Sequence, residues 1–215
     1  METINEYLNK TESAAQKIFE GIDCYLKILD DNQRPIFPMF ISSEIDEDRF
    51  QEEFERWRET HRDEIESSLT VQKQFINESF ALSTLCGALL QLAFMGIQQY
   101  SNNTSPCEGF EHIIKKESKA AKYCVGRPVR NIPLGLIIYA GRNQYNHFDK
   151  NDNLRKPNLF IFEKLCKYRS QDQSYREPAF DLKNRFLTIY AHNIISILEW
   201  RNYEIYANDM REMVE

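Results

Sequence analysis

A long apolar run between Phe80 and Ile97, FALSTLCGALLQLAFMGI, is the feature that most limits how this chain can fold. It approaches the roughly 20 apolar residues that a membrane-spanning helix needs. However, it contains Ser83, Thr84 and Gln91, and no second run of this kind accompanies it. We therefore predict that it forms the buried central helix of a helical bundle, without membrane association.

Helical periodicity extends over most of the remaining sequence. Apolar residues recur at spacings of three and four between Ile4 and Leu29, which predicts one long amphipathic helix that ends before Pro35. The same spacing predicts helices over residues 50–100 with a break near 67–70, and over 110–122, 131–147, 157–166 and 181–210.

The scarcity of Gly and Pro, at seven each, argues against a protein built from many tight turns. We predict an all-α protein, a single-domain bundle of about six helices. Residues 170–178 are expected to form a loop. The segment Ile36–Ile41, IFPMFI, is the one plausible strand, and we expect it to be an extended loop that packs on the bundle.

The cysteines indicate a reducing environment. They are odd in number and form no Cys-x-x-Cys pair, so they suggest neither a disulfide framework nor a zinc site. They are Cys24, Cys86, Cys107, Cys124 and Cys166. The sequence begins with a polar segment and has no apolar secretory region there. We expect a cytoplasmic protein with reduced thiols, no metal and no cofactor.

Charge is distributed unevenly along the chain, although the net charge is only −6. Residues 110–170 contain 13 Lys and Arg against 5 Asp and Glu, whereas residues 1–109 contain 9 against 20. A basic region of this kind is suited to a polyanion such as RNA. It could also complement the acidic N-terminal half, whose own acidic surface is either a solvated helix face or a partner-binding surface.

The helix predicted over residues 131–147 ends in a polar cluster, GRNQYNHFD. Arg142 and His147 are five positions apart and are therefore rotated by about 140° on a helix. Asn143 shares a helix face with His147, and Asn146 shares one with Arg142, because each pair is four positions apart. The amides are thus placed to orient the two charged groups.

An arginine and a histidine together suit the cleavage of RNA without a metal. In that reaction the 2′-hydroxyl attacks the adjacent phosphate, a proton moves near neutral pH, and negative charge builds on the phosphorane. Histidine has an unperturbed pKa of about 6.5, and arginine offers a planar fork of donors to phosphate oxygens. One His does not easily supply both base and acid, so a homodimer that brings two clusters together would complete the site.

The hexapeptide RNQYNH, with Arg142, Asn143 and His147, resembles the Arg-x4-His motif of the HEPN domain superfamily of all-helical nucleotide-binding and ribonuclease domains. The helical context matches over residues 70–210, which leaves residues 1–66 as an N-terminal helical extension of a single domain, 1–215. One departure is visible: a branch silenced by nucleotidylation has a Tyr two residues after the His, where this chain has Asp149.

The resemblance implies a homodimer with a shared cleft and a metal-independent endoribonuclease activity, in a bacterial toxin–antitoxin or defence system with an antitoxin or other defence protein as partner. On this basis Arg142 would bind and stabilise the scissile phosphate, His147 would act as general acid and base, and Asn143 would orient the pair. The alternative within the family is a non-catalytic dimer that binds RNA or nucleotide, or that scaffolds a larger complex.

Four further residues are predicted to contact the substrate. Arg127 and Arg130 could hold flanking phosphates, Tyr145 could stack on a base, and Asn146 belongs to the polar cluster itself. Each has a structural alternative: the arginines could be solvated loop charges, and Tyr145 could pack in the bundle. The whole cluster could also be a plain helix end that is stabilised by its cations.

Overall fold

The computed structural model describes residues 3–31, 38–43, 46–148, 154–170 and 173–214. Within these residues the protein is mostly helical, as predicted, with seven α-helices: α1 (Ile4–Asp31), α2 (Glu47–Thr60), α3 (Arg62–Tyr100), α4 (Leu134–Asn146), α5 (Lys156–Cys166), α6 (Ala191–Ile197) and α7 (Tyr203–Glu212). Shorter elements are the 3-10 helices η1 (Lys119–Tyr123) and η3 (Pro178–Phe180), and the strands β1 (Pro128–Val129), β2 (Ile132–Pro133), β3 (Lys167–Ser170) and β4 (Gln173–Arg176).

The chain divides into two compact units. The first comprises residues 1–23 and 82–215, and the second comprises residues 24–81. Helices α1 and α3 each contribute residues to both units. The basic region of the sequence and its polar cluster belong entirely to the first unit.

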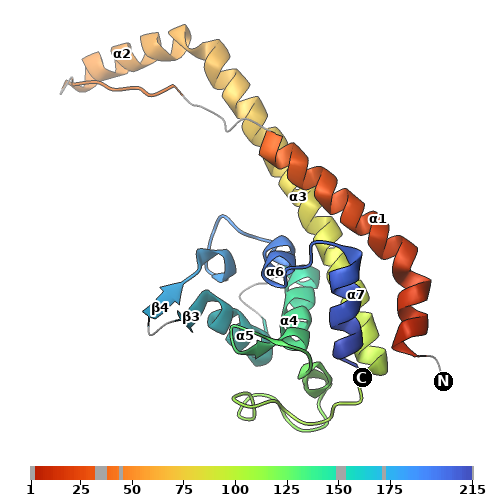
Figure 1. The fold of residues 1–215 in the computed structure, drawn as a ribbon. Coiled ribbons are helices and arrows are strands. Elements are labelled where there is room, and N and C mark those ends of the chain that lie inside the picture. Colours follow the sequence, from red (N-terminus) through yellow and green to blue (C-terminus); the bar gives the residue numbers. More distant parts are fainter. Residues whose placement is uncertain (1–2, 32–37, 44–45, 149–153, 171–172, 215) are drawn as a thin grey trace. The chain divides into compact units, whose positions relative to one another are not determined.

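The core of the first unit surrounds α4, which packs against α5, α6 and η1 (Figure 1). Its neighbour α3 is, among the described residues, the one helix long and apolar enough to cross a membrane, and half of its most apolar stretch is buried inside the structure. Leu89, Leu90 and Ile97 of α3 are fully buried. This burial is what a core helix of a bundle requires.

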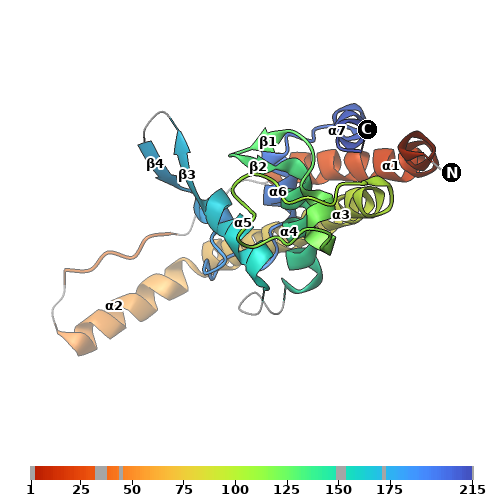
Figure 2. The ribbon, with the colours of Figure 1, turned by 90° about the horizontal axis from the view of Figure 1, so that it is seen from below.

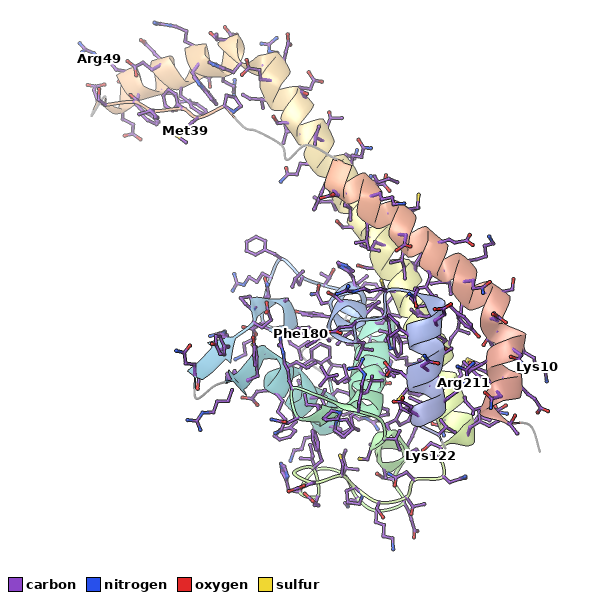
Figure 3. All side chains as sticks on the ribbon, viewed as in Figure 1. Lys10, Met39, Arg49, Lys122, Phe180 and Arg211 are labelled. Atoms are coloured by element: carbon purple, nitrogen blue, oxygen red, sulfur yellow. The ribbon has the colours of Figure 1, made fainter. Side chains whose placement is uncertain are left out.

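The second unit contains α2 and the segment 38–43, together with parts of α1 and α3. Asp46 caps α2, because its carboxylate accepts from the backbone N–H groups of Asp48 and Arg49. The ring of Phe40 packs against three aromatic rings of α2, those of Phe50, Phe54 and Trp57. Figure 3 shows this unit with Met39 and Arg49 labelled.

Several local predictions are wrong. The helical break falls at His61, between α2 and α3, and not near residues 67–70. Residues 110–118 form turns and not a helix, with φ of +79° at Gly109 and +62° at Glu117. Phe110 is buried, and its ring lies 5.6 Å from that of Phe160 of α5, measured between centroids. An apolar residue at this position therefore packs against a distant helix and does not indicate a helix of its own.

The C-terminal part also departs from the prediction. Residues 170–178, predicted as a loop, contribute to the antiparallel β3–β4 hairpin. The single helix predicted over residues 181–210 is replaced by irregular chain followed by α6 and α7. The break between these two helices has φ of +59° at Glu199, and the Asn202 side chain caps α7 by accepting from the Ile205 N–H. Residues 38–41 form no strand, and Ile36 lies outside the described residues.

A tight turn leads into α4. Arg130 and Asn131 connect the paired residues Val129 and Ile132, and both turn residues have positive φ, +50° and +60°. Asn tolerates this conformation better than Arg does, so the backbone at Arg130 is strained. The helix itself begins after Pro133, which occupies the N-cap position, three residues later than the predicted start at Asn131.

Candidate functional site

The polar cluster occupies the last turn of α4. The helix is buried from Leu134 through Ile138, and Gly135 is needed because a Cβ there would lie 2.6 Å from the carbonyl oxygen of Tyr123. After Gly141 the helix turns polar and ends, with His147 as its exposed C-cap residue. The last turn therefore presents polar side chains from a helix that the core holds rigidly.

Arg142 is held by neutral groups. Its Nε donates to Gln91 Oε1 at 2.8 Å, and its Nη1 donates to Asn143 Oδ1 at 3.3 Å. In the amide orientation that satisfies both of its polar atoms, Asn146 accepts from three guanidinium nitrogens at 2.9–3.1 Å. The guanidinium also lies 4.4 Å from the ring centroid of Phe94.

No described carboxylate forms an ion pair with Arg142. Amide oxygens and an aromatic face orient a guanidinium without cancelling its charge. The positive charge at the end of α4 is therefore available to an anion.

A pocket of about 650 Å³ lies beside this cation. Asn143 and His147 line it, together with Tyr139, also from α4. The remaining lining residues come from residues 113–120 and from the chain around the start of α5: Ile113, Lys115, Ser118, Lys119, Ala120, Leu154, Arg155, Pro157 and Asn158. The cationic lining residues are thus Lys115, Lys119 and Arg155, and no Asp or Glu of the described residues lines the pocket.

Asn143 connects the two sides of the site. Its Oδ1 accepts from Arg142, and its Nδ2 donates to Asn158 Oδ1 at 3.4 Å. Asn158 is only 6% exposed and lies in the first turn of α5. Asn143 is therefore hydrogen-bonded to Arg142 on one side and to the pocket residue Asn158 on the other.

Lys119 and Arg142 both lie over the aromatic ring of Phe94. Lys119 lies 5.0 Å from the centroid of the Phe94 ring that supports Arg142, and this ring stacks on Tyr123. Burial raises the pKa of Tyr123 well above its usual range, nearby Tyr139 raises it further, and the charge of Arg142 opposes the shift. Tyr123 consequently stays protonated near neutral pH and is no candidate for a base.

Two members of the polar cluster face the core. Gln144 is fully buried: its Nε2 donates to the carbonyl of Thr188 at 2.8 Å, and its Oε1 accepts from the N–H of Tyr190 at 3.1 Å. Tyr145 packs on Gly87 of α3, where an added Cβ would lie 2.3 Å from the tyrosine ring. Neither residue lines the pocket, so Tyr145 is placed for packing and not for base stacking.

Arg127 and Arg130 lie outside the pocket lining, and their donors are used within the fold. Arg127 binds both carboxylate oxygens of Asp209, at 2.9 and 3.1 Å, and the carbonyl of Leu198 at 2.7 Å. Arg130 donates to the carbonyl of Leu165 and lies 3.8 Å from the ring centroid of Tyr168. We therefore leave both arginines out of the proposed phosphate site.

Sequence reasoning missed the role of Lys115, Lys119 and Arg155. The positive charge of residues 110–170 was the available signal, but it did not indicate which cations line a pocket with His147. Lys122, labelled in Figure 3, shows the difficulty: its Nζ donates to the Gln98 carbonyl at 3.0 Å, so this cation is directed at α3.

No protein-family model, no curated protein and no solved structure matches this chain. Among the described residues, His, Cys, Asp and Glu side chains form no group of three or more that could hold a metal ion.

Proposed function

We propose that the α4 pocket binds RNA and that Arg142 and His147 cleave it in a HEPN-type, metal-independent reaction. The observation that carries this proposal is a pocket lined by His147 and three cations, without a described acid, next to an arginine that no described carboxylate pairs with. A phosphodiester supplies the negative charge that this surface lacks.

The proposed reaction is an attack of the ribose 2′-oxygen on the adjacent phosphorus. A base removes the 2′-hydroxyl proton, the bond to the 5′-oxygen breaks, and an acid protonates that leaving oxygen. The products carry a 2′,3′-cyclic phosphate and a 5′-hydroxyl. His147 performs one proton transfer, and Arg142 stabilises the charge on the phosphorane. The second proton transfer falls to His147 of another copy in a homodimer.

Arg142 does not itself line the pocket. Its neighbour Asn143 does, and the guanidinium is bonded to that amide, so a phosphate at Asn143 lies next to the cation. Exchange of the amide partners for phosphate oxygens replaces neutral acceptors by anionic ones, which adds the attraction between opposite charges and allows bidentate contact.

The position of Arg142 outside the pocket lining also favours a second function. Because Gln91 and the Phe94 ring hold the guanidinium outside the pocket lining, the site could bind RNA or a nucleotide without cleaving it. In that case Arg142 would contribute charge alone.

Cleavage of end-labelled RNA in EDTA separates these functions. We expect the wild-type protein to leave 2′,3′-cyclic phosphate ends, and His147→Ala and Arg142→Ala to lose cleavage. The matched controls are His112→Ala and Arg185→Ala, because both side chains are exposed and neither lines the pocket. Binding without cleavage by the wild type would favour the second function, and equal cleavage by all variants would place the active site elsewhere.

A further inference from the structure

The β3–β4 hairpin carries an aromatic face that the α4 site does not use. Tyr168 of β3 is paired directly with Tyr175 of β4, so the two rings share one face of the ribbon. Lys167, Arg169 and Arg176 occupy the opposite face by the alternation of the strands. Figures 1 and 2 both show the hairpin extending away from α4.

The two tyrosines belong to an ordered stack. Their ring centroids are 5.3 Å apart and the rings are within 19° of parallel. The guanidinium carbon of Arg130 lies 3.8 Å from the Tyr168 centroid. Since a ring has only two faces, Arg130 and Tyr175 cover opposite faces of Tyr168. The outer face of Tyr175 ends the stack, and this residue is 40% exposed.

The base of the stack is held by the fold. Arg130 sits in the strained β1–β2 turn, donates to the Leu165 carbonyl, and lies 3.8 Å from a carboxylate oxygen of Glu177. Its side chain is 19% exposed. These contacts fix the guanidinium against the inner face of Tyr168.

Exposed cations lie on the opposite face of the hairpin, one residue away from the stacked tyrosines along each strand. Arg169 has no ion pair with a described residue, and Arg176, next to Tyr175, is paired with Asp181 at the surface. Lys167 is paired with Glu163, and both side chains are more than half exposed. Surface pairs of this kind contribute little to stability, so their cations can exchange carboxylate for phosphate oxygens.

We propose that the β3–β4 hairpin binds single-stranded RNA, with one base stacked on the outer face of Tyr175 at the β4 edge and the adjacent phosphate at Arg176, the next residue of that strand. The inference depends on the proposed RNA function and adds its substrate class, since a base in a duplex has no free face to stack. Base–aromatic stacking tolerates any base, so the hairpin would select unpaired strands over sequence.

Fluorescence anisotropy with a labelled single-stranded RNA and the matching duplex tests this. We expect Tyr175→Leu, which keeps an apolar partner for Tyr168, to weaken single-strand binding by about tenfold, as loss of one stacked base predicts. Tyr175→Phe should bind within about twofold of wild type, because it keeps the ring. Duplex binding should be unchanged in both variants.

Phe186→Leu is the matched control, because this aromatic side chain is 96% exposed and is not part of the stack. If Tyr175→Leu binds single strands as tightly as the wild type, the hairpin proposal is wrong, while His147-dependent cleavage would leave the proposed function intact. If the wild type binds no RNA of either kind, both proposals fail. Circular dichroism of each variant separates lost binding from lost folding.

Discussion

Two arginines from the basic region of the sequence, Arg127 and Arg142, have opposite electrostatic environments. Arg127 binds both oxygens of Asp209, whose carboxylate also accepts from the indole N–H of Trp200 at 2.7 Å. Arg142 is surrounded by amides and the face of Phe94. The first charge is neutralised inside the fold, whereas no carboxylate of the described residues pairs with the second.

The comparison of Arg127 with Arg142 shows that local charge density in the sequence does not identify which cations lack a carboxylate partner among the described residues. Hydrogen bonding to Asp209 raises the pKa of Arg127, and Asp209 is only 7% exposed. A nearly buried carboxylate of this kind costs free energy unless it is paired. Arg127 therefore serves the fold, and the proposed phosphate site contains Arg142 alone of the two.

The largest expected effect is on cleavage. Arg142→Gln removes the cation but keeps a side chain that can hydrogen-bond to neighbouring amides. We expect the single-turnover rate of RNA cleavage to fall by about 100-fold or more, as for loss of one transition-state donor. The free energy of unfolding should change by only about 1 kcal/mol, the size of the lost contact with Phe94. A rate within threefold of wild type, or about that, would contradict the proposed role.

Next in size is a loss of stability. Asp209→Asn keeps the shape of the side chain but removes the charge that binds Arg127 and Trp200. We expect the free energy of unfolding in urea to fall by about 2–3 kcal/mol, a value reduced for the partial exposure of Arg127. RNA binding should be unaffected. Glu20→Gln, at the exposed Lys17–Glu20 pair, is the control and should cost less than about 0.5 kcal/mol.

A smaller effect is expected on the salt dependence of RNA binding. Lys115→Gln, Lys119→Gln and Arg155→Gln each remove one cation of the pocket, so each should lower the dependence of log K on log salt by about 0.7 for a single-stranded RNA. Arg127→Gln should leave this slope unchanged, because its charge is already paired. An equal decrease in all four variants would remove the distinction between the two arginine sites.

The smallest effect tests the buried side of α4, where Gln144 accepts from the N–H of Tyr190. Burial raises the pKa of Tyr190 to about 12, and nearby Asp181 and Cys166 add to the shift. Above the usual tyrosine pKa of about 10, the unfolded chain ionises first. Stability should therefore be complete below pH 10, or about that, and be lost as the pH rises towards about 12.

Tyr190→Phe should reduce that alkaline loss, measured as the change in the urea midpoint across this range of pH. The remaining loss comes from other tyrosines such as Tyr7, whose pKa burial also raises to about 12. The Tyr190 hydroxyl donates to the Asp181 carbonyl. An unchanged pH dependence in Tyr190→Phe would mean that the pKa of this hydroxyl is the same in the folded and the unfolded protein.

Helices with a continuous apolar stripe could be predicted from sequence. α1, α3, α4 and α5 lie close to their expected positions, because spacing of three and four residues is a local property. The failures occur where apolar residues meet distant partners. Phe110 has the spacing of a helical position but contacts α5, and Trp200 lies in the break between α6 and α7, where its indole donates to Asp209 and Arg127 binds the same carboxylate from 82 residues away.

Part of the candidate site was also predictable. Arg142, Asn143 and His147 were identified from their spacing at a helix end, and Asn143 does contact Arg142. Tyr145 was predicted for base stacking, yet its ring packs on Gly87, which is far away in sequence. The Tyr168–Tyr175 stack was not found, because residues 170–178 contain no apolar alternation that would predict a strand.

The helical class, the long helices and the polar end of α4 could be read from the sequence, since they follow from periodicity and from side chains within one or two turns of each other. Tertiary packing, in contrast, sets which cations are neutralised and which line the pocket with His147. Asp209 is 82 residues from Arg127, and Lys115 and Lys119 reach the pocket through turns that no period indicates. Such pairings depend on how distant segments pack, which local sequence does not encode.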